Sequence, residues 1–191
     1  MRMDRLLADL EAAEAARRAA EKRLEIAEGV RAERAAVTLE DRLRGALGSA
    51  VEVVAAGHPV RGRLVEVGSG WVALDRSSRE AVVLGVDDLA RPGSVIVATA
   101  AIESVTGLRA THVKDEAPSV GRTWGSVLRA IGRSRATVVW RTTVGNEFTG
   151  LVDAVGVDHA VVRRSAGSPV VLTTQAVACV EVGARRGEDY R

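Results

Sequence analysis

Residues 60–68, VRGRLVEVG, recur 88 positions later as residues 148–156, FTGLVDAVG. In both segments apolar side chains alternate with other residues around a glycine, Gly62 in the first and Gly150 in the second. Such alternation is typical of a β-strand with one buried face, and a glycine inside a strand permits a sharp bend or a close backbone approach. The chain is therefore predicted to contain two related, bent strands.

The correspondence extends to both sides of these strands. Three further pairs of segments match in the same order: 43–48 with 128–132, 71–74 with 159–162, and 95–105 with 170–180. A shared order of short helix, glycine-centred strand and terminal strand pair indicates an internal duplication. Short β-branched runs in the first copy predict strands at 51–54, 60–67, 71–74, 81–84, 95–99 and 103–106.

The N-terminal segment has a different composition. Residues 3–36 contain no proline and are dominated by alanine, glutamate, arginine and leucine, which favour a helix. Apolar residues follow a heptad-like spacing, which Arg17 interrupts: Met3, Leu6, Leu10, Ala13, Ala20, Leu24 and Ala27. Two interpretations stay open, a coiled coil that associates with another copy and a single amphipathic helix that rests on a neighbour.

These patterns divide the chain into five parts. The polar stretch THVKDEAPS has no periodicity and is interpreted as a linker. In order, the predicted parts are a long amphipathic helix (1–36), a first repeat (37–110) with an insertion near 80–93, the linker (111–119), a second repeat (120–184) and a polar tail (185–191). The predicted fold class is mainly β, a long helix followed by two small bent-sheet barrels, each preceded by a short helix.

Composition limits the kind of protein further. Apolar residues make up 47% of the 191 residues, enough for a core, but aromatic residues make up only 3%. The single cysteine, Cys179, excludes an intramolecular disulfide and a cysteine-cluster zinc site, and is interpreted as a small core residue. The sequence has no signal-peptide pattern and no apolar run of ~18–20 residues, so a cytoplasmic protein without a membrane span is predicted.

A resemblance to a known family rests on the glycine-centred strands and on Gly57 and Gly145 at the preceding hairpin positions. Their order resembles the Sm-like family (LSm and Hfq), over roughly residues 37–108 and 119–183. The layout is also similar to poorly characterised bacterial proteins that join an N-terminal coiled helix to Sm-like domains. The resemblance implies two Sm-like, SH3-like barrels and an association with RNA. Because open strand edges pair readily, a homo-oligomer through strand edges and residues 1–36 is expected.

The loops that read RNA bases in that family differ here. Residues 68–71 are GSGW and residues 156–159 are GVDH, so Trp71 and His159 stand near the expected asparagine. The family's second RNA-binding loop carries an arginine, which residues 100–102 and 175–177 lack. The RNA pocket therefore does not carry over residue by residue. Trp71 is interpreted either as a platform for a base or as a core residue.

Basic residues gather in the second repeat. Residues 119–191 hold ten basic and six acidic side chains, whereas the whole chain has a net charge of +2. The candidate nucleic-acid-binding residues are Arg122, Arg129, Arg133, Arg135 and Arg141, with Trp71. Contacts with backbone phosphates are one interpretation of the five arginines, and an ordinary solvated surface is the other.

Motifs for catalysis are absent from the sequence. There is no phosphate-binding or dinucleotide-binding glycine loop, and the three histidines show no metal-ligand spacing. No enzyme activity, cofactor or metal is therefore predicted. The expected function is a non-enzymatic protein associated with RNA or DNA. The alternative is a protein-interaction or oligomerisation scaffold, whose Sm-like domains have lost RNA readout and whose N-terminal helix recruits a protein partner.

Overall fold

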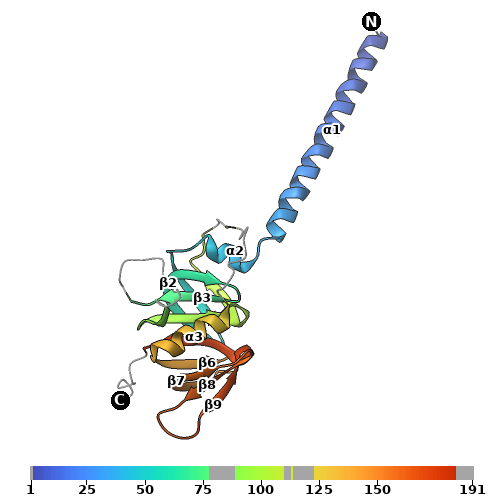
Figure 1. The fold of residues 1–191 in the computed structure, drawn as a ribbon. Helices are drawn as coiled ribbons and strands as arrows, with labels where there is room; N and C mark the ends of the chain where they lie inside the picture. The colour runs from blue at the N-terminus through green and yellow to red at the C-terminus, as the bar shows by residue number, and fades with distance from the viewer. Residues whose placement is uncertain (1, 78–88, 110–112, 114–122, 184–191) are drawn as a thin grey trace. The chain divides into compact units, whose positions relative to one another are not determined.

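The computed structural model describes residues 2–77, 89–109, 113 and 123–183, and the chain divides into two units, Met1–Thr38 and Leu39–Arg191. The first unit is a single helix, α1 (Arg2–Ala35), drawn in blue in Figure 1. Ion pairs between residues four apart, such as Arg17 with Glu21 at 3.1 Å, follow its surface. Such pairs add to the helix propensity of a segment without proline.

The second unit is built mainly of strands, which confirms the predicted mainly β class. In chain order its elements are α2 (Leu39–Arg44), β1 (Ala50–Ala55), β2 (His58–Gly68), β3 (Trp71–Asp75), β4 (Ser94–Ala98), η2 (Thr99–Ala101), β5 (Ile102–Thr106), α3 (Trp124–Ser134), β6 (Thr137–Thr142), β7 (Glu147–Val155), β8 (His159–Arg163), β9 (Val170–Thr173), η3 (Thr174–Ala176) and β10 (Val177–Val182). Five strands therefore come from each half of the duplicated sequence.

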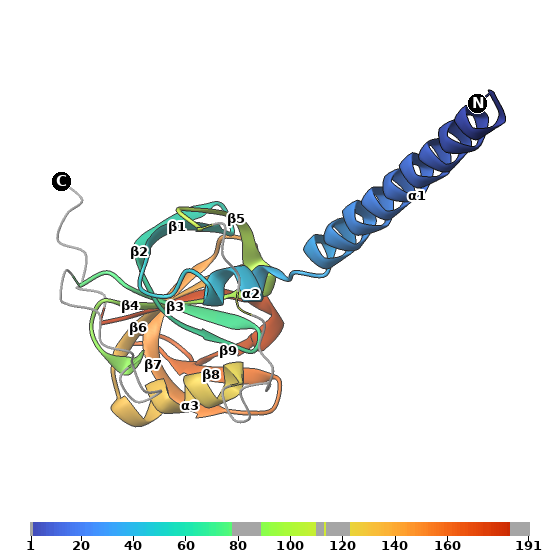
Figure 2. The ribbon, with the colours of Figure 1, turned by 90° about the horizontal axis from the view of Figure 1, so that it is seen from above.

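The strands form one antiparallel sheet in the order β5-β1-β2-β3-β4-β10-β6-β7-β8-β9. Within each half the order is fifth, first, second, third and fourth strand. The two halves meet where β4 pairs with β10, the last strand of the second half. Strands β5 and β9 lie at the two ends of the sheet. Figure 2 shows how strongly β2 curves along its length.

The glycines that identify the repeat occupy the same structural position in both halves. A Cβ atom added to Gly62 would lie 2.9 Å from the carbonyl oxygen of Asp75, and one added to Gly150 would lie 2.5 Å from that of Arg163. Asp75 and Arg163 are also 88 residues apart. Only glycine therefore permits this close approach of the second strand to the third, and the same packing occurs twice.

Bulges occupy matching positions as well. The register of β2 on β3 shifts between Leu64 and Glu66, and that of β7 on β8 shifts between Val152 and Ala154. A bulge bends a strand and increases its twist. Each second strand is therefore bent by a glycine and by a bulge a few residues later.

The hydrophobic core runs across the junction of the two halves. Trp71 and Ile96 from the first half are fully buried in the same cluster as Trp140 and Val180 from the second half. Conversely, Cys179 on β10 is fully buried among residues of the first half, which confirms its assignment to the core. The second unit is therefore held together by packing as well as by the β4–β10 hydrogen bonds.

Some predicted features lie outside the described residues. These are the strand at 81–84, residues 80–88 of the insertion, the linker 111–119 apart from 113, and the tail 185–191. The end of the insertion is described, and Leu89 is fully buried there. In the part of the chain that the structure covers, no helix is long and apolar enough to cross a membrane.

Candidate nucleic-acid interface

Helix α3 carries the centre of the predicted basic cluster. Its N-terminus is capped by Thr123, whose Oγ1 accepts a hydrogen bond from the backbone N–H of Ser126 at 3.4 Å. The helix ends at Arg135, which adopts the left-handed conformation (φ 52°) and donates its backbone N–H to the Gly132 carbonyl at 3.2 Å. A left-handed residue is a common end of a helix, although glycine is the usual choice.

The helix is amphipathic. Its buried face consists of Val127, Leu128, Ala130 and Ile131. Gly132 lets the helix approach β7 closely, because a Cβ atom there would lie 3.3 Å from Cγ1 of Val152. Arg129 and Arg133 lie on the exposed face, four residues apart and thus on one side of the helix.

Three of the predicted arginines line one groove between α3 and β7. We call it the α3–β7 groove; it is an open hollow of about 430 Å³ lined by Arg129, Gly132, Arg133, Arg135 and residues 152–155. Asp153 is the acidic residue among these, and it also lies 3.5 Å from Nε of Arg163. With three guanidinium groups against one carboxylate, the lining of the groove is positively charged.

The three arginines differ in the interactions that their side chains already make within the protein. In the described part of the chain, Arg129 and Arg135 have no carboxylate within ion-pair distance, whereas Arg133 makes interactions of its own. All three side chains are exposed. Exposed guanidinium groups without a protein carboxylate are the ones that can accept a phosphate without breaking an existing pair.

Arg141 does not belong to this groove. It lies on β6 and forms ion pairs with Glu147 at 3.0 Å and with Glu181 at 3.4 Å. We therefore correct the predicted grouping of Arg141 with the other arginines. Arg141 is close to them in sequence, but strand pairing places its guanidinium beside two carboxylates, which offset its charge. Arg122, the remaining arginine of the cluster, lies outside the described residues.

Trp71 is fully buried, so it is not available to stack on a base. Its ring packs over Gly68, where an added Cβ atom would overlap the indole. Of the two interpretations of Trp71, the core residue is correct and the base platform is wrong. The corresponding residue in the second half, His159, is partly exposed and lies 2.8 Å from the Asp158 carboxylate, which lowers the pKa of Asp158.

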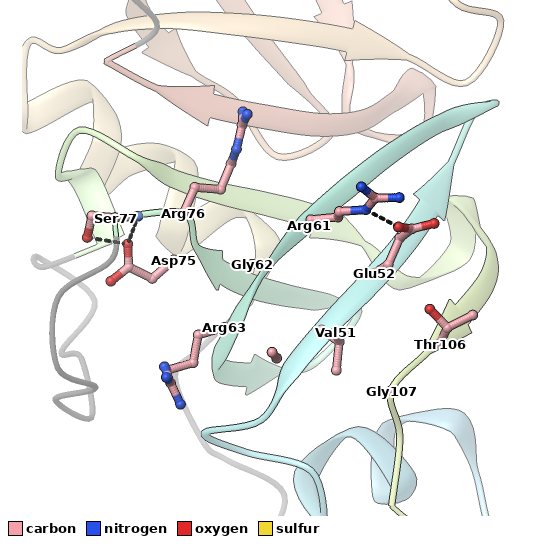
Figure 3. A pocket seen from close by; sticks show the side chains of 11 residues that line it. Val51, Glu52, Arg61, Gly62, Arg63, Asp75, Arg76, Ser77, Thr106 and Gly107 are labelled. Atoms are coloured by element: carbon pink, nitrogen blue, oxygen red, sulfur yellow. Dashed lines mark hydrogen bonds and ion pairs between the residues drawn. The ribbon is translucent and has the colours of Figure 1, made fainter.

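A second pocket lies in the first half and was not predicted from the sequence. It measures about 590 Å³ and is lined by β1, β2, the end of β3 and the end of β5 (Figure 3). Its three arginines already have partners: Arg61 pairs with Glu52, Arg63 donates to the Gly48 carbonyl, and Arg76 pairs with Glu181. The flanking of Gly62 by two arginines is a sequence signal for this pocket. Glu52 and Asp75 also line it, so it is less basic than the α3–β7 groove, whose lining contains one carboxylate.

Metal-binding groups are not found in the described residues, where no three histidine, cysteine, aspartate or glutamate side chains come together. Comparisons with protein-family models, with curated proteins and with solved structures found no match to this chain.

Proposed function

We propose that this chain is a non-enzymatic protein that binds the phosphate backbone of RNA or DNA at the α3–β7 groove. The observation that carries the proposal is the placement of Arg129, Arg133 and Arg135 around one open hollow. Guanidinium groups present paired N–H donors that match the oxygens of a phosphate, and they stay charged at any physiological pH.

Backbone contacts are favoured over base reading by what lines the groove. No aromatic side chain is among its described lining residues, so bases have no stacking platform there. Phosphate contacts position a nucleic acid but carry no sequence information. Binding at this groove is therefore expected to depend strongly on salt and weakly on sequence.

We also propose that each half of the second unit is a Sm-like barrel. The strand order within each half and the bent second strand with its glycine support this interpretation. The nucleic-acid site proposed here does not use the base-reading loops of that family, because none of residues 68–71 or 156–159 is among the lining residues of the α3–β7 groove.

The proposal is tested by fluorescence anisotropy with random-sequence RNA and duplex DNA at roughly 50 and 200 mM salt. If the three arginines each neutralise one phosphate, the logarithm of the duplex affinity falls with a slope of about −2.7 against the logarithm of salt. That slope corresponds to a loss of about 40-fold between the two concentrations. Replacing Arg129, Arg133 and Arg135 together by alanine is expected to abolish the salt-dependent binding.

A matched variant controls for net charge. Replacing Arg42, Arg61 and Arg109 by alanine removes the same number of positive charges from exposed positions in the first half. This variant is expected to keep most of the affinity. Equal losses in both triple variants, or no binding of the unmodified chain at the lower salt, would overturn the proposed site.

The second candidate function, an oligomerisation scaffold, is supported by helix α1. Leu24 and Ile26 are 64% and 59% exposed on this helix, although both are large apolar side chains. Leu24 also occupies a predicted heptad core position. We propose that α1 pairs with α1 of a second copy, because burying Leu24 against its counterpart removes apolar surface from water.

Light scattering after size-exclusion chromatography tests this second candidate. Leu24→Asp is expected to lower the mass of the full-length chain, because a charge at a heptad core position opposes pairing. Ala19→Asp introduces the same charge at an exposed position outside the heptad core and is expected to leave the mass unchanged. An unchanged mass for Leu24→Asp would rule out pairing through α1.

A further inference from the structure

The short segment that connects α3 to β6 has a structural counterpart in the first half. Strands β1 and β6 both have six residues and begin 87 positions apart in the chain. In each half, this strand places its second residue opposite the glycine of the bent strand. The residue two positions before the strand is Gly48 in the first half and Arg135 in the second, so these two residues correspond to each other.

Both residues adopt the left-handed backbone conformation. The φ angle is 78° at Gly48 and 52° at Arg135. In this conformation the Cβ atom of an L-residue approaches its own backbone, and glycine avoids the resulting strain because it has no Cβ atom. In the described part of the chain, Arg135 and Ala56 are the two residues other than glycine with a positive φ. The same turn is therefore made once by glycine and once by a strained arginine.

The turn itself does not require an arginine. Its hydrogen bond comes from the backbone N–H of residue 135, which donates to the Gly132 carbonyl, and every residue except proline has this donor. A positive charge at the end of a helix interacts favourably with the helix dipole, but Arg133 already supplies one in the last turn of α3. The arginine at position 135 is therefore explained by what its side chain reaches.

That side chain lines the α3–β7 groove, whereas the side chains on either side of it do not. Ser134 closes the helix end: its Oγ donates to the Ile131 carbonyl at 2.7 Å and accepts from the backbone N–H of Ala136 at 3.3 Å. Ala136 packs against the hydrophobic core. Between α3 and β6, a basic side chain reaches the groove from position 135, where the backbone is left-handed.

We propose that position 135 gives up stability for ligand binding: arginine is strained there, and its guanidinium binds a backbone phosphate of the nucleic acid. This inference rests on the proposed function of the α3–β7 groove. Strained residues persist where the surrounding structure holds them in place, and they are common at ligand-binding sites. The proposal adds a stability cost at one named residue, a cost that Gly48 avoids at the same place in the first half.

Two substitutions of Arg135 separate the strain from the guanidinium. Arg135→Gly and Arg135→Ala both remove the guanidinium, but only glycine also removes the strain. Arg135→Gly is expected to raise the melting temperature of the full chain by roughly 2–4 °C, whereas Arg135→Ala is not expected to raise it. If arginine served to stabilise the end of α3, both substitutions would lower the melting temperature.

Binding is measured on the same two variants by fluorescence anisotropy with random-sequence RNA and duplex DNA. Both variants are expected to lose affinity several-fold and to a similar extent, because both lack one phosphate contact. The slope of the logarithm of duplex affinity against the logarithm of salt should change from about −2.7 to about −1.8. A residue with a purely structural role would leave this slope unchanged. In Arg135→Gly the loss of affinity accompanies a gain in stability, so unfolding does not explain it.

Gly48→Ala is the matched control in the first half. A Cβ atom at Gly48 would meet nothing within 4 Å, so the cost of this substitution is conformational. The variant is expected to lower the melting temperature by roughly 2–4 °C and to leave the affinity for both nucleic acids unchanged. It measures the cost of a residue other than glycine at the position that corresponds to Arg135.

Three results would overturn the inference, and they differ in what they leave of the proposed function. Unchanged affinity and salt slope in Arg135→Gly would leave a groove that binds through Arg129 and Arg133 alone. A melting temperature that falls in Arg135→Gly as in Arg135→Ala would show that arginine stabilises the helix end, and would not touch the proposed function. Absence of binding by the unmodified chain at the lower salt would overturn the proposed function and this inference together.

Discussion

Nη1 of Arg76 lies 2.5 Å from Oε1 of Glu181, and this ion pair joins the end of the third strand of one half to the last strand of the other. The Arg76 side chain is 49% exposed, and that of Glu181 is 17% exposed. Glu181 also accepts from Arg141 at 3.4 Å, so one carboxylate connects β10 to its neighbour β6 and, on the other side, to the end of β3, which lies one strand beyond its neighbour β4.

A double-mutant cycle of Arg76→Ala and Glu181→Ala measures the first of these pairs. Partial exposure and solvent screening limit the coupling free energy, and we expect about 0.5–1 kcal/mol from denaturant unfolding. The Arg163–Asp153 pair, with side chains 55% and 52% exposed and a longer distance of 3.5 Å, serves as the comparison. Its coupling is expected to be close to zero, and a larger value there than at Arg76–Glu181 would contradict this ranking.

Gly150→Ala is expected to destabilise the second unit, because its Cβ atom would lie 2.5 Å from the Arg163 carbonyl oxygen. Relief of such a clash requires movement of the backbone, and the cost is about 2 kcal/mol, or a melting temperature lower by roughly 4–8 °C. Gly62→Ala meets the Asp75 carbonyl at 2.9 Å and is expected to cost less. Gly29→Ala on α1, which meets nothing within 4 Å, is the control and should not lower the melting temperature.

The bent strands and their glycines were predictable because the information is local. Alternation of apolar residues and a central glycine repeat within nine residues, and Gly62 and Gly150 do mark the close approach of neighbouring strands. The two halves are joined to each other by the pairing of β4 with β10. The identity of these strands was not predictable, because both are apolar runs that look alike in sequence.

The environments of Trp71 and Arg141 depend on residues far away in the chain. Trp71 is covered by a cluster that includes Val180, and Arg141 pairs with Glu181, which is 40 residues further along. Neither partner is visible from a sequence window around the residue itself. The groove beside α3 was predictable only in part, since helical spacing relates Arg129 to Arg133, whereas Asp153 comes from a separate strand.

Cys179 is expected to resist modification in the folded chain. Burial raises the pKa of its thiol, and the nearby Arg141 guanidinium offsets that effect only in part. A protonated, buried thiol is a poor nucleophile. At pH 8 a thiol reagent is therefore expected to modify Cys179 only after denaturant unfolds the chain, and rapid labelling without denaturant would contradict the buried position of β10.

The same pKa shift makes stability depend on pH in the alkaline range. A thiol whose pKa is raised by folding binds its proton more tightly in the folded state than in the unfolded state. Its contribution to the free energy of unfolding is therefore fully present below the ordinary thiol pKa of roughly 8.5. That contribution is lost as the pH rises through the higher folded pKa. The measurement is the free energy of unfolding as a function of pH, in the unmodified chain and in Cys179→Ala. The decrease at alkaline pH should be steeper in the unmodified chain. Parallel curves would contradict the raised pKa of the Cys179 thiol.

Ala56→Asn is expected to stabilise the β1–β2 hairpin. The two residues between these strands, Ala56 and Gly57, both have positive φ angles, of 50° and 74°, as the two central residues of a type I′ turn do. Alanine is strained in this conformation, whereas Asn-Gly is the preferred pair for such a turn. A gain of about 1 kcal/mol, or roughly 2–4 °C in melting temperature, is expected.

Ala55→Asn, one residue earlier and inside β1, should instead lower the melting temperature, because it puts an amide at a position that is 1% exposed. A loss of stability in Ala56→Asn of similar size would show that the hairpin does not adopt this turn in solution.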